Sequence, residues 1–299
     1  MAAIPFDLSL LYPLFFLLAI LSVLFLFWRA ARHELIDSNE AFDLIAVGSI
    51  GAAVMARLFD FFGKNDPSSW QLARLLFFNR YGSFDFYGAL VGLVVAFFVF
   101  LRSKKVNVWS VLDLAAAPLA FGQMLVALGA YLSGGNWILG SQPLWSFLGY
   151  LLLFVLLKRL ATRKRHPGFF FSFYLVGHAT VDILTFGFRR EVHWLAKIPY
   201  ELAAPILLFL VTLAVWYALA RRNLQEDVKW LSGLVLLSIF RTIRMVKSAN
   251  ESGKFSKSII FFPYYVARSV LSLLLIIARE VRLALLDFLY VFGIRRFLK

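Results

Sequence analysis

The sequence contains no cysteine, which excludes disulfide bonds, thiolate metal sites and a cysteine nucleophile within this chain. It has only four histidines, and neither these nor the acidic residues show HExxH or a similar metal-ligand spacing. A glycine-rich phosphate loop is also missing. The sequence therefore predicts neither a metal site nor another cofactor.

Acidic residues are scarce as well, with 17 Asp and Glu against 31 Lys and Arg, so the formal net charge is +14. A strongly basic chain can bind nucleic acid, but no nucleic-acid-binding motif accompanies these cations. Many of them flank apolar segments, which favours attraction to anionic lipid headgroups. We therefore expect anionic headgroups as partners and no nucleic acid.

Long apolar runs dominate the composition, which is 61% hydrophobic and includes 33 Phe. This is too apolar for a soluble domain of this length. Runs near the ~20 residues that cross a bilayer as a helix recur along the chain. They cover about 11–28, 44–63, 84–101, 113–132, 144–157, 169–187 and 201–219. The sequence predicts an all-α, polytopic membrane protein of about seven transmembrane helices, the fifth short unless it begins in the preceding loop.

Basic residues mark one side of this predicted bundle, because they follow the first, third, fifth and seventh apolar segments. They are Arg29, Arg32, Arg102, Lys104, Lys105, Lys158, Arg159, Arg163, Lys164, Arg165, Arg221 and Arg222. The opposite loops carry fewer cations, so the positive-inside rule places the N-terminus outside and the end of the seventh helix in the cytoplasm. The first segment lacks a basic n-region and a small-residue cleavage site, which is typical of a retained anchor.

The last part of the chain has a different pattern. Residues 231–240 are too few to span, and 258–278 is interrupted by Pro263 and Arg268. Residues 279–299 mix arginines with Leu, Phe and Tyr, as in an interfacial helix. We expect a membrane domain over 1–222 and a basic helical extension over 223–299 on the cytoplasmic side, with an extra membrane hairpin as the alternative.

Ionisable side chains at membrane depth are costly, so each is a functional candidate. Arg57, inside the second segment, could hold a lipid phosphate bidentately or pair locally with Asp60 three residues later. His178 and Asp182 lie four residues apart and so share one face of the sixth helix. The carboxylate could orient the imidazole as a proton acceptor, or the two could form a structural polar pair.

Other polar residues lie near helix ends. Tyr12 and Tyr87 begin the first and third segments. Tyrosines at such positions usually anchor a helix at the membrane interface, and the alternative is a catalytic or phosphate-binding role. Asp85 is expected to be a solvated charge at a helix start, and Gln123 could add amide hydrogen bonds. The loop 133–140 could form a lid or an anion nest, or a plain turn.

Residues 86–92 read Phe-Tyr-Gly-Ala-Leu-Val-Gly, and this is the most specific motif in the chain. It resembles the Phe-(His or Tyr)-Gly-Gly/Ala-Leu-Ile-Gly motif of the bacterial prolipoprotein diacylglyceryl transferases. Ala56-Arg57-Leu58 is similar to the Gly-Ala-Arg-Leu of that family, and Tyr12 to a tyrosine in its first helix. The resemblance covers about residues 10–222.

The resemblance implies transfer of a diacylglyceryl group from phosphatidylglycerol to the lipobox cysteine thiol of a prolipoprotein, in the bacterial cytoplasmic (inner) membrane. The products would be a thioether and glycerol phosphate. The reaction needs a base for the thiol and cations for the departing phosphate. The implied site comprises His178 as the base, Asp182 to orient it, Tyr12 and Tyr87 as hydrogen-bonding partners, and Arg57, Gln123 and Gly129 for substrate binding.

The fourth apolar segment departs from the family pattern Gly-Arg-x-Gly-Asn-Phe-x-Asn-Gly-Glu. Here Ala127, Ala130 and Gly135 stand where the family has Arg, Asn and Glu. In the sixth segment the Arg and Glu of the family fall on His178 and Asp182. The alternative is therefore a catalytically degenerate member that binds phospholipid or a membrane partner without catalysis. A transporter is a weaker third interpretation, since no inverted repeat supports it.

Overall fold

The computed structural model describes residues 10–34, 38–63, 84–102, 104, 106–134, 141–161, 165–189, 194–195 and 198–220. The chain divides into two units, Met1–Leu219 and Ala220–Lys299. The described residues belong to the first unit, apart from Ala220 at its boundary. The extension expected over 223–299 lies outside the described residues, as do residues 135–140 of the expected loop.

Seven apolar helices make up most of the described part of the first unit, and each corresponds to one predicted segment. They are α1 (Leu11–His33), α2 (Ser38–Gly63), α5 (Phe86–Leu101), α6 (Val108–Ser133), α7 (Gln142–Leu160), α8 (Phe169–Thr185) and α9 (Tyr200–Ala220). Six are long and apolar enough to cross a membrane, and α5, with 16 residues, is shorter. The prediction of an all-α membrane protein is confirmed. Helix α7 reaches spanning length because it begins at Gln142, in the preceding loop.

The remaining described elements are short. A 3₁₀ turn, η3 (Phe186–Phe188), continues from α8. Strand β1 (Trp194–Leu195) pairs antiparallel with β2 (Ile198–Pro199), directly before α9 begins at Tyr200. This two-residue pair connects the end of α8 to the start of α9.

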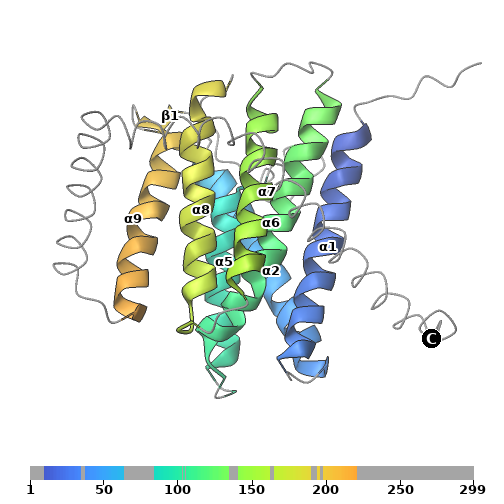
Figure 1. The fold of residues 1–299 in the computed structure, drawn as a ribbon, viewed down its shortest axis with the longest axis vertical. Helices are drawn as coiled ribbons and strands as arrows, with labels where there is room; N and C mark the ends of the chain where they lie inside the picture. The colour runs from blue at the N-terminus through green and yellow to red at the C-terminus, as the bar shows by residue number, and fades with distance from the viewer. Residues whose placement is uncertain are drawn as a thin grey trace, which may run out of the picture. The chain divides into compact units, whose positions relative to one another are not determined.

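Helix α6 lies at the centre of the bundle, where it packs against α1, α7 and α8, while α5 packs on α2. Half of the apolar stretch of α6 is buried, against 11% for α1 and for α9. Among the described helices, α1 and α9 are therefore the least covered by protein. The helices alternate in direction, and α1 begins at the same end at which α8 finishes, the upper end in Figure 1.

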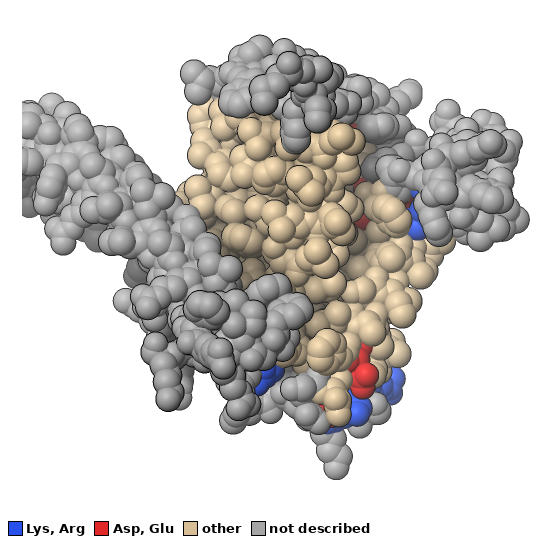
Figure 2. All heavy atoms as spheres, turned by 90° about the vertical axis from the view of Figure 1, so that its right-hand side faces the viewer, with Lys and Arg blue, Asp and Glu red and all other residues tan. Residues whose placement is uncertain are grey.

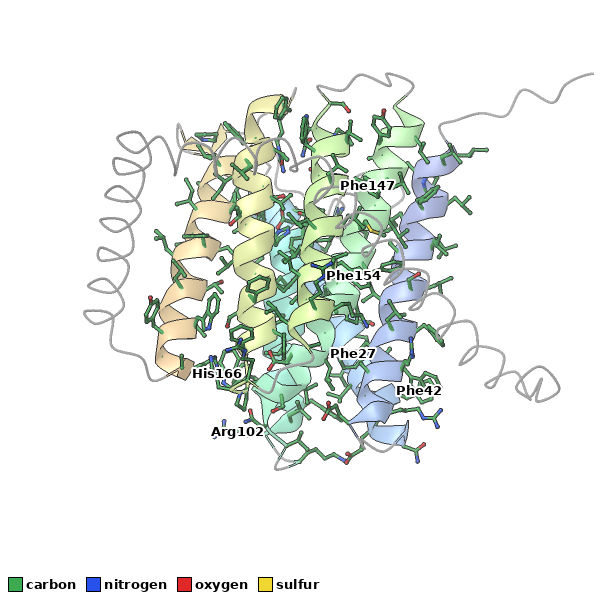
Figure 3. All side chains as sticks on the ribbon, viewed as in Figure 1. Phe27, Phe42, Arg102, Phe147, Phe154 and His166 are labelled. Carbon is green, nitrogen blue, oxygen red and sulfur yellow. The ribbon has the colours of Figure 1, made fainter. Side chains whose placement is uncertain are left out.

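Described cations concentrate at the opposite end. Figure 2 shows most of the visible Lys and Arg atoms at the lower end of the described surface, and Figure 3 labels Arg102 there beside His166. At the upper end the described residues include only two cations, Arg57 and Arg189. The distribution agrees with a cytoplasmic lower end under the positive-inside rule.

Helix α8 is fixed at its start by a carboxylate from α6. Gly168 adopts a left-handed conformation with φ of +86°, which favours glycine. Its N–H donates to Asp113 Oδ2 at 2.7 Å, and the Phe171 N–H donates to Asp113 Oδ1 at 2.8 Å. Since the first N–H groups of a helix have no partner within it, Asp113 satisfies two of them and sets the position of α8 on α6.

Glycines bring α2 and α5 into backbone contact. A Cβ on Gly92 would overlap the carbonyl oxygen of Gly51, and a Cβ on Gly88 would lie 2.5 Å from the carbonyl oxygen of Met55. Small residues allow this approach between membrane helices. The contact fixes the first turn of α5, and with it Tyr87, against α2.

We expect Gly92→Ala to destabilise the protein by about 1–3 kcal/mol, because the new methyl group meets a backbone oxygen that cannot rotate away. The measurement is thermal unfolding of the purified protein in detergent micelles. Gly187→Ala is the matched control, since no atom of the described residues lies within 4 Å of its added Cβ, and it should change stability by less than about 0.5 kcal/mol. Equal melting temperatures for the two variants would contradict this packing.

Candidate active site

His178, on α8, is the centre of a buried polar network, with 2% of its surface exposed. Its Nδ1 lies 2.8 Å from the Tyr150 hydroxyl of α7 and 3.1 Å from Gln123 Oε1 of α6. Three helices thus hold the imidazole in one orientation, and the predicted residue Gln123 is one of its two direct partners.

The hydrogen-bond pattern assigns the imidazole proton. The structure places Gln123 Oε1, an acceptor, against Nδ1, and this arrangement favours the tautomer with the hydrogen on Nδ1. Tyr150 donates its own proton to Asp182 Oδ1 at 3.0 Å, and its oxygen is therefore free to accept from Nδ1. In the neutral imidazole Nε2 then carries the lone pair, and it is buried without a hydrogen-bond partner among the described residues.

Asp182 is an acceptor for two tyrosines. Its Oδ2 accepts from the Tyr87 hydroxyl at 2.7 Å, and its Oδ1 accepts from Tyr150. The distance from Asp182 Oδ2 to His178 Nε2 is 3.7 Å, too long for a hydrogen bond. The sequence led us to expect that Asp182 orients the imidazole directly. Instead the Tyr150 hydroxyl connects the two side chains, because it contacts both the Asp182 carboxylate and the His178 imidazole.

Aromatic rings enclose the imidazole and exclude water from it. Phe86 lies 4.4 Å from His178 between ring centroids, while Tyr150 and Tyr174 stack against it at 5.7 and 6.1 Å. Tyr174 is fully buried, and its hydroxyl has no hydrogen-bond partner among the described residues. Buried polar atoms are rarely left unpaired, so the Tyr174 hydroxyl and His178 Nε2 are two groups that a bound substrate could satisfy.

Arg189 approaches the same carboxylate from the turn after α8. Its Nη2 lies 3.9 Å from Asp182 Oδ2, an ion-pair distance without a hydrogen bond. The Nε of this side chain is buried and has no partner among the described residues. The guanidinium thus places a cation beside the network.

A second buried polar cluster adjoins the first where α5 begins. The Asp85 N–H donates to the Ala56 carbonyl of α2 at 3.1 Å, and Asp85 Oδ1 accepts from the Gly88 N–H at 2.9 Å. Tyr200 hydrogen-bonds the Asp85 carboxylate, and its ring lies 6.2 Å from that of Tyr87. Asp85 does begin α5, but the expectation that it is solvated was wrong, since it is 4% exposed and caps the helix.

An apolar cavity of about 160 Å³ lies between α1, α2, α5 and α6. Its walls include Phe27, Leu90 and Phe97, with Ser49 as a polar side chain among them. Phe86 lines this cavity and also contacts His178. Phe86 therefore borders both the apolar cavity and the polar network, an arrangement that suits a substrate with an apolar tail and a polar reacting end.

Residues 3–220 match the family model of prolipoprotein diacylglyceryl transferases. The chain belongs to this family. A phosphatidylglycerol–prolipoprotein diacylglyceryl transferase of Streptococcus pneumoniae serotype 4 is 26% identical over 235 residues, covering 66% of this chain and 88% of the relative. A protein of the same name from Methylococcus capsulatus is 24% identical over 169 residues, covering 54% and 59%.

In this transferase-family chain the structure joins four of the predicted site residues, Tyr87, Gln123, His178 and Asp182, in one hydrogen-bonded network. Arg57 lies in α2, 6% exposed, and its Nη1 pairs with Asp60 Oδ2 at 3.3 Å. This is the local pair that the sequence offered as an alternative. It leaves the phosphate-binding role of Arg57 a prediction.

Two other predicted residues lie apart from the network. Tyr12 is 43% exposed and stacks on Phe16 of its own helix, as an interfacial anchor would. Gly129 is buried against Phe15, and a Cβ there would overlap that side chain, so the glycine serves the contact between α1 and α6. Their proposed catalytic and substrate-binding roles have no support from these contacts.

Three residues of the site were missed from the sequence, namely Tyr150, Tyr174 and Arg189. Tyr174 lies four residues before His178, so the spacing that joined His178 to Asp182 could have identified it. Tyr150 stands alone in an apolar helix and Arg189 in a loop. No local pattern distinguishes those two from interfacial residues. Ala127 is buried in α6 and supplies no polar group where the family has an arginine.

No group of three or more His, Asp or Glu residues that could hold a metal occurs in the described part of the chain.

Proposed function

We propose that this protein transfers a diacylglyceryl group from phosphatidylglycerol to the lipobox cysteine thiol of a prolipoprotein, in the bacterial cytoplasmic membrane. The family match over 3–220 and the names of the two relatives support this assignment. The apolar helices support an integral membrane enzyme. We propose that the basic end of the bundle contacts anionic headgroups.

The observation that carries the proposal is His178 Nε2, which is buried, has no hydrogen-bond partner among the described residues and is held in place through Nδ1. A cysteine thiol is a weak nucleophile until it loses its proton, because the thiolate is the reactive form. A fixed imidazole next to a bound thiol can accept that proton. We assign His178 the role of general base.

The proposed reaction is a displacement at the carbon of the diacylglyceryl group that is bonded to the phosphate oxygen. The thiol proton passes to His178 Nε2, and the sulfur attacks this carbon. A C–S bond forms as the C–O bond to phosphate breaks, and glycerol phosphate leaves with the bonding electrons. The imidazolium then returns its proton to the phosphate, which restores the neutral histidine.

Asp182 stabilises the imidazolium in this scheme. Its Oδ2 lies 3.7 Å from Nε2, so the positive charge forms next to a carboxylate that two tyrosines hold in place. We assign Asp182 and Tyr87 to positioning and to charge stabilisation. The cavity beside Phe86 is suited to part of an acyl chain, because its lining is apolar.

The second candidate is a lipid-binding member without catalysis. Ala127 and Ala130 favour it, since neither can stabilise the charge that develops on the leaving phosphate, and losing one such group lowers turnover by about 10²–10³-fold in other enzymes. On this alternative the polar network would only stabilise the packing of α5, α7 and α8.

Purified protein given phosphatidylglycerol and a lipobox peptide separates the two functions. We expect a peptide that gains the mass of one diacylglyceryl group through a linkage stable to hydroxylamine, as a thioether is. A peptide with Ser in place of the lipobox Cys is the control and should remain unmodified. Bound phosphatidylglycerol without any modified peptide would reject the transferase and support the lipid-binding alternative.

A further inference from the structure

We propose that the Arg189 guanidinium binds the phosphate group of the anionic phospholipid at this site. The inference rests on the proposed function for the identity of the lipid. It assigns the phosphate contact to a residue in the turn after α8, a place at which no motif in the sequence pointed to a ligand.

Arg189 is held at the edge of the polar network. Its backbone N–H donates to the Phe186 carbonyl at 3.0 Å, which fixes the start of the side chain. The side chain is 23% exposed, so it is open on one side and buried on the other. Its Nε is on the buried side and has no acceptor among the described residues.

Asp182 does not satisfy this guanidinium. The carboxylate accepts hydrogen bonds from Tyr87 and Tyr150, and Arg189 Nη2 lies 3.9 Å away, beyond hydrogen-bond distance. A guanidinium has five N–H donors in a planar fork that matches the oxygens of a phosphate. The Arg189 guanidinium therefore has N–H donors available for an oxyanion.

The phosphate contact would lie close to the base. His178 Nε2 and Arg189 Nη2 lie 3.7 and 3.9 Å from the same oxygen, Asp182 Oδ2. The two nitrogens can therefore be no more than about 7.6 Å apart. A phosphate held by Arg189 would keep its ester carbon within reach of a thiol at His178.

The other described cation at this end is engaged differently. Arg57 pairs with Asp60 at 3.3 Å, and both side chains are buried. Using Arg57 for the lipid would require it to share or release Asp60, and breaking a buried pair is strongly unfavourable. Arg189 needs no such rearrangement, because its ion pair is long and its Nε has no acceptor among the described residues.

The first test is kinetic. We expect Arg189→Gln to raise the KM for phosphatidylglycerol and the inhibition constant of glycerol phosphate by about 10- to 100-fold, since a charge-assisted bidentate contact is lost. Arg189→Lys keeps the charge and should lose less, and methylguanidinium should partly rescue Arg189→Ala. Arg102→Gln removes an exposed cation at the opposite end and should leave the inhibition constant of soluble glycerol phosphate unchanged.

The second test needs no catalysis. Purified protein is equilibrated with detergent micelles containing equal amounts of phosphatidylglycerol and diacylglycerol, which lacks the phosphate, and the retained lipid is measured by mass spectrometry. We expect the parent protein to enrich phosphatidylglycerol over diacylglycerol, and Arg189→Gln to reduce that enrichment by about tenfold. Inorganic phosphate is added as a second probe. If it binds the parent protein in an Arg189-dependent manner while lipid enrichment does not depend on Arg189, the site takes free phosphate and the lipid assignment is overturned.

The two tests separate the inference from the proposed function. An Arg189-dependent preference for phosphatidylglycerol without thioether product rejects the transferase but supports the phosphate contact. Thioether product with an unchanged KM and unchanged lipid preference in Arg189→Gln supports the transferase and rejects the role of Arg189.

Discussion

Replacing His178 by Asn should lower the rate of thioether formation at pH 7 by about 10²–10⁴-fold, the usual contribution of a general base. The asparagine amide can take the place of Nδ1–H as a donor to Gln123 Oε1 and Tyr150, which the parent contacts at 3.1 and 2.8 Å. It supplies no lone pair at the position of Nε2. The substitution thus removes the base and keeps the network.

The pH dependence of this loss distinguishes a base from a structural residue. A cysteine thiol has a pKa of about 8.5, so only a few per cent is thiolate at pH 7, and the fraction rises about eightfold from pH 7 to pH 8. The variant depends on thiolate already present, so its rate should rise with pH up to about 8.5. The parent rate should rise less, and the ratio of the two rates should shrink by roughly tenfold over this range.

Folding and lipid binding provide the controls for His178→Asn. Its melting temperature in detergent should fall only modestly, because the hydrogen bonds are kept and only the ring contacts with Phe86, Tyr150 and Tyr174 are lost. Its retention of phosphatidylglycerol should match the parent. A rate deficit that stays constant from pH 7 to pH 9 would contradict the assignment of His178 as the base.

Much of the fold followed from the sequence because each membrane helix is specified locally. A run of about 20 apolar residues satisfies its own backbone hydrogen bonds and needs no partner segment to be recognised. The helix 84–101 was found for this reason although α5 is short, and 144–157 was underestimated because α7 begins with the polar Gln142 and Pro143. Polar residues in the first turn of a membrane helix do not stand out from the preceding loop by hydropathy.

The site was accessible from the sequence where its residues share one helix. Tyr174, His178 and Asp182 follow at four-residue steps, and all are buried in α8. The contacts of Tyr150 and Arg189 depend on how α7 and η3 pack, which spacing along one chain does not encode. Asp85 is a similar case, since its described contacts come from Ala56 of α2 and Tyr200 of α9, which are distant from it in sequence.

The departures from the family pattern acquire a physical meaning in this geometry. An arginine at 178 could not act as a base, because a guanidinium stays protonated in proteins. The imidazole at this position can take up and return a proton, while a cation stands nearby at Arg189. We propose that proton transfer and phosphate binding are divided between these two residues in this chain.

Asp182→Asn should lower the rate of thioether formation by about 10²–10³-fold. The neutral amide leaves the imidazolium without a counter-charge at 3.7 Å, and two unit charges at about 4 Å attract by roughly 4 kcal/mol at an effective dielectric constant near 20. The amide also presents a donor to one of the two tyrosine hydroxyls that Asp182 now accepts from. Initial rates with saturating phosphatidylglycerol give kcat, the parameter in which this loss should appear.

Asp113→Asn is the matched control, because Asp113 also accepts two hydrogen bonds, from backbone N–H groups at the other end of α8. It should lower the melting temperature as Asp182→Asn does, yet keep kcat within a few-fold of the parent, since its carboxylate lies far from the imidazole along the helix. Asp182→Glu restores the charge and should recover a large part of kcat. Equal kcat values for Asp182→Asn and Asp113→Asn, measured on fully folded protein, would show that Asp182 serves the fold alone.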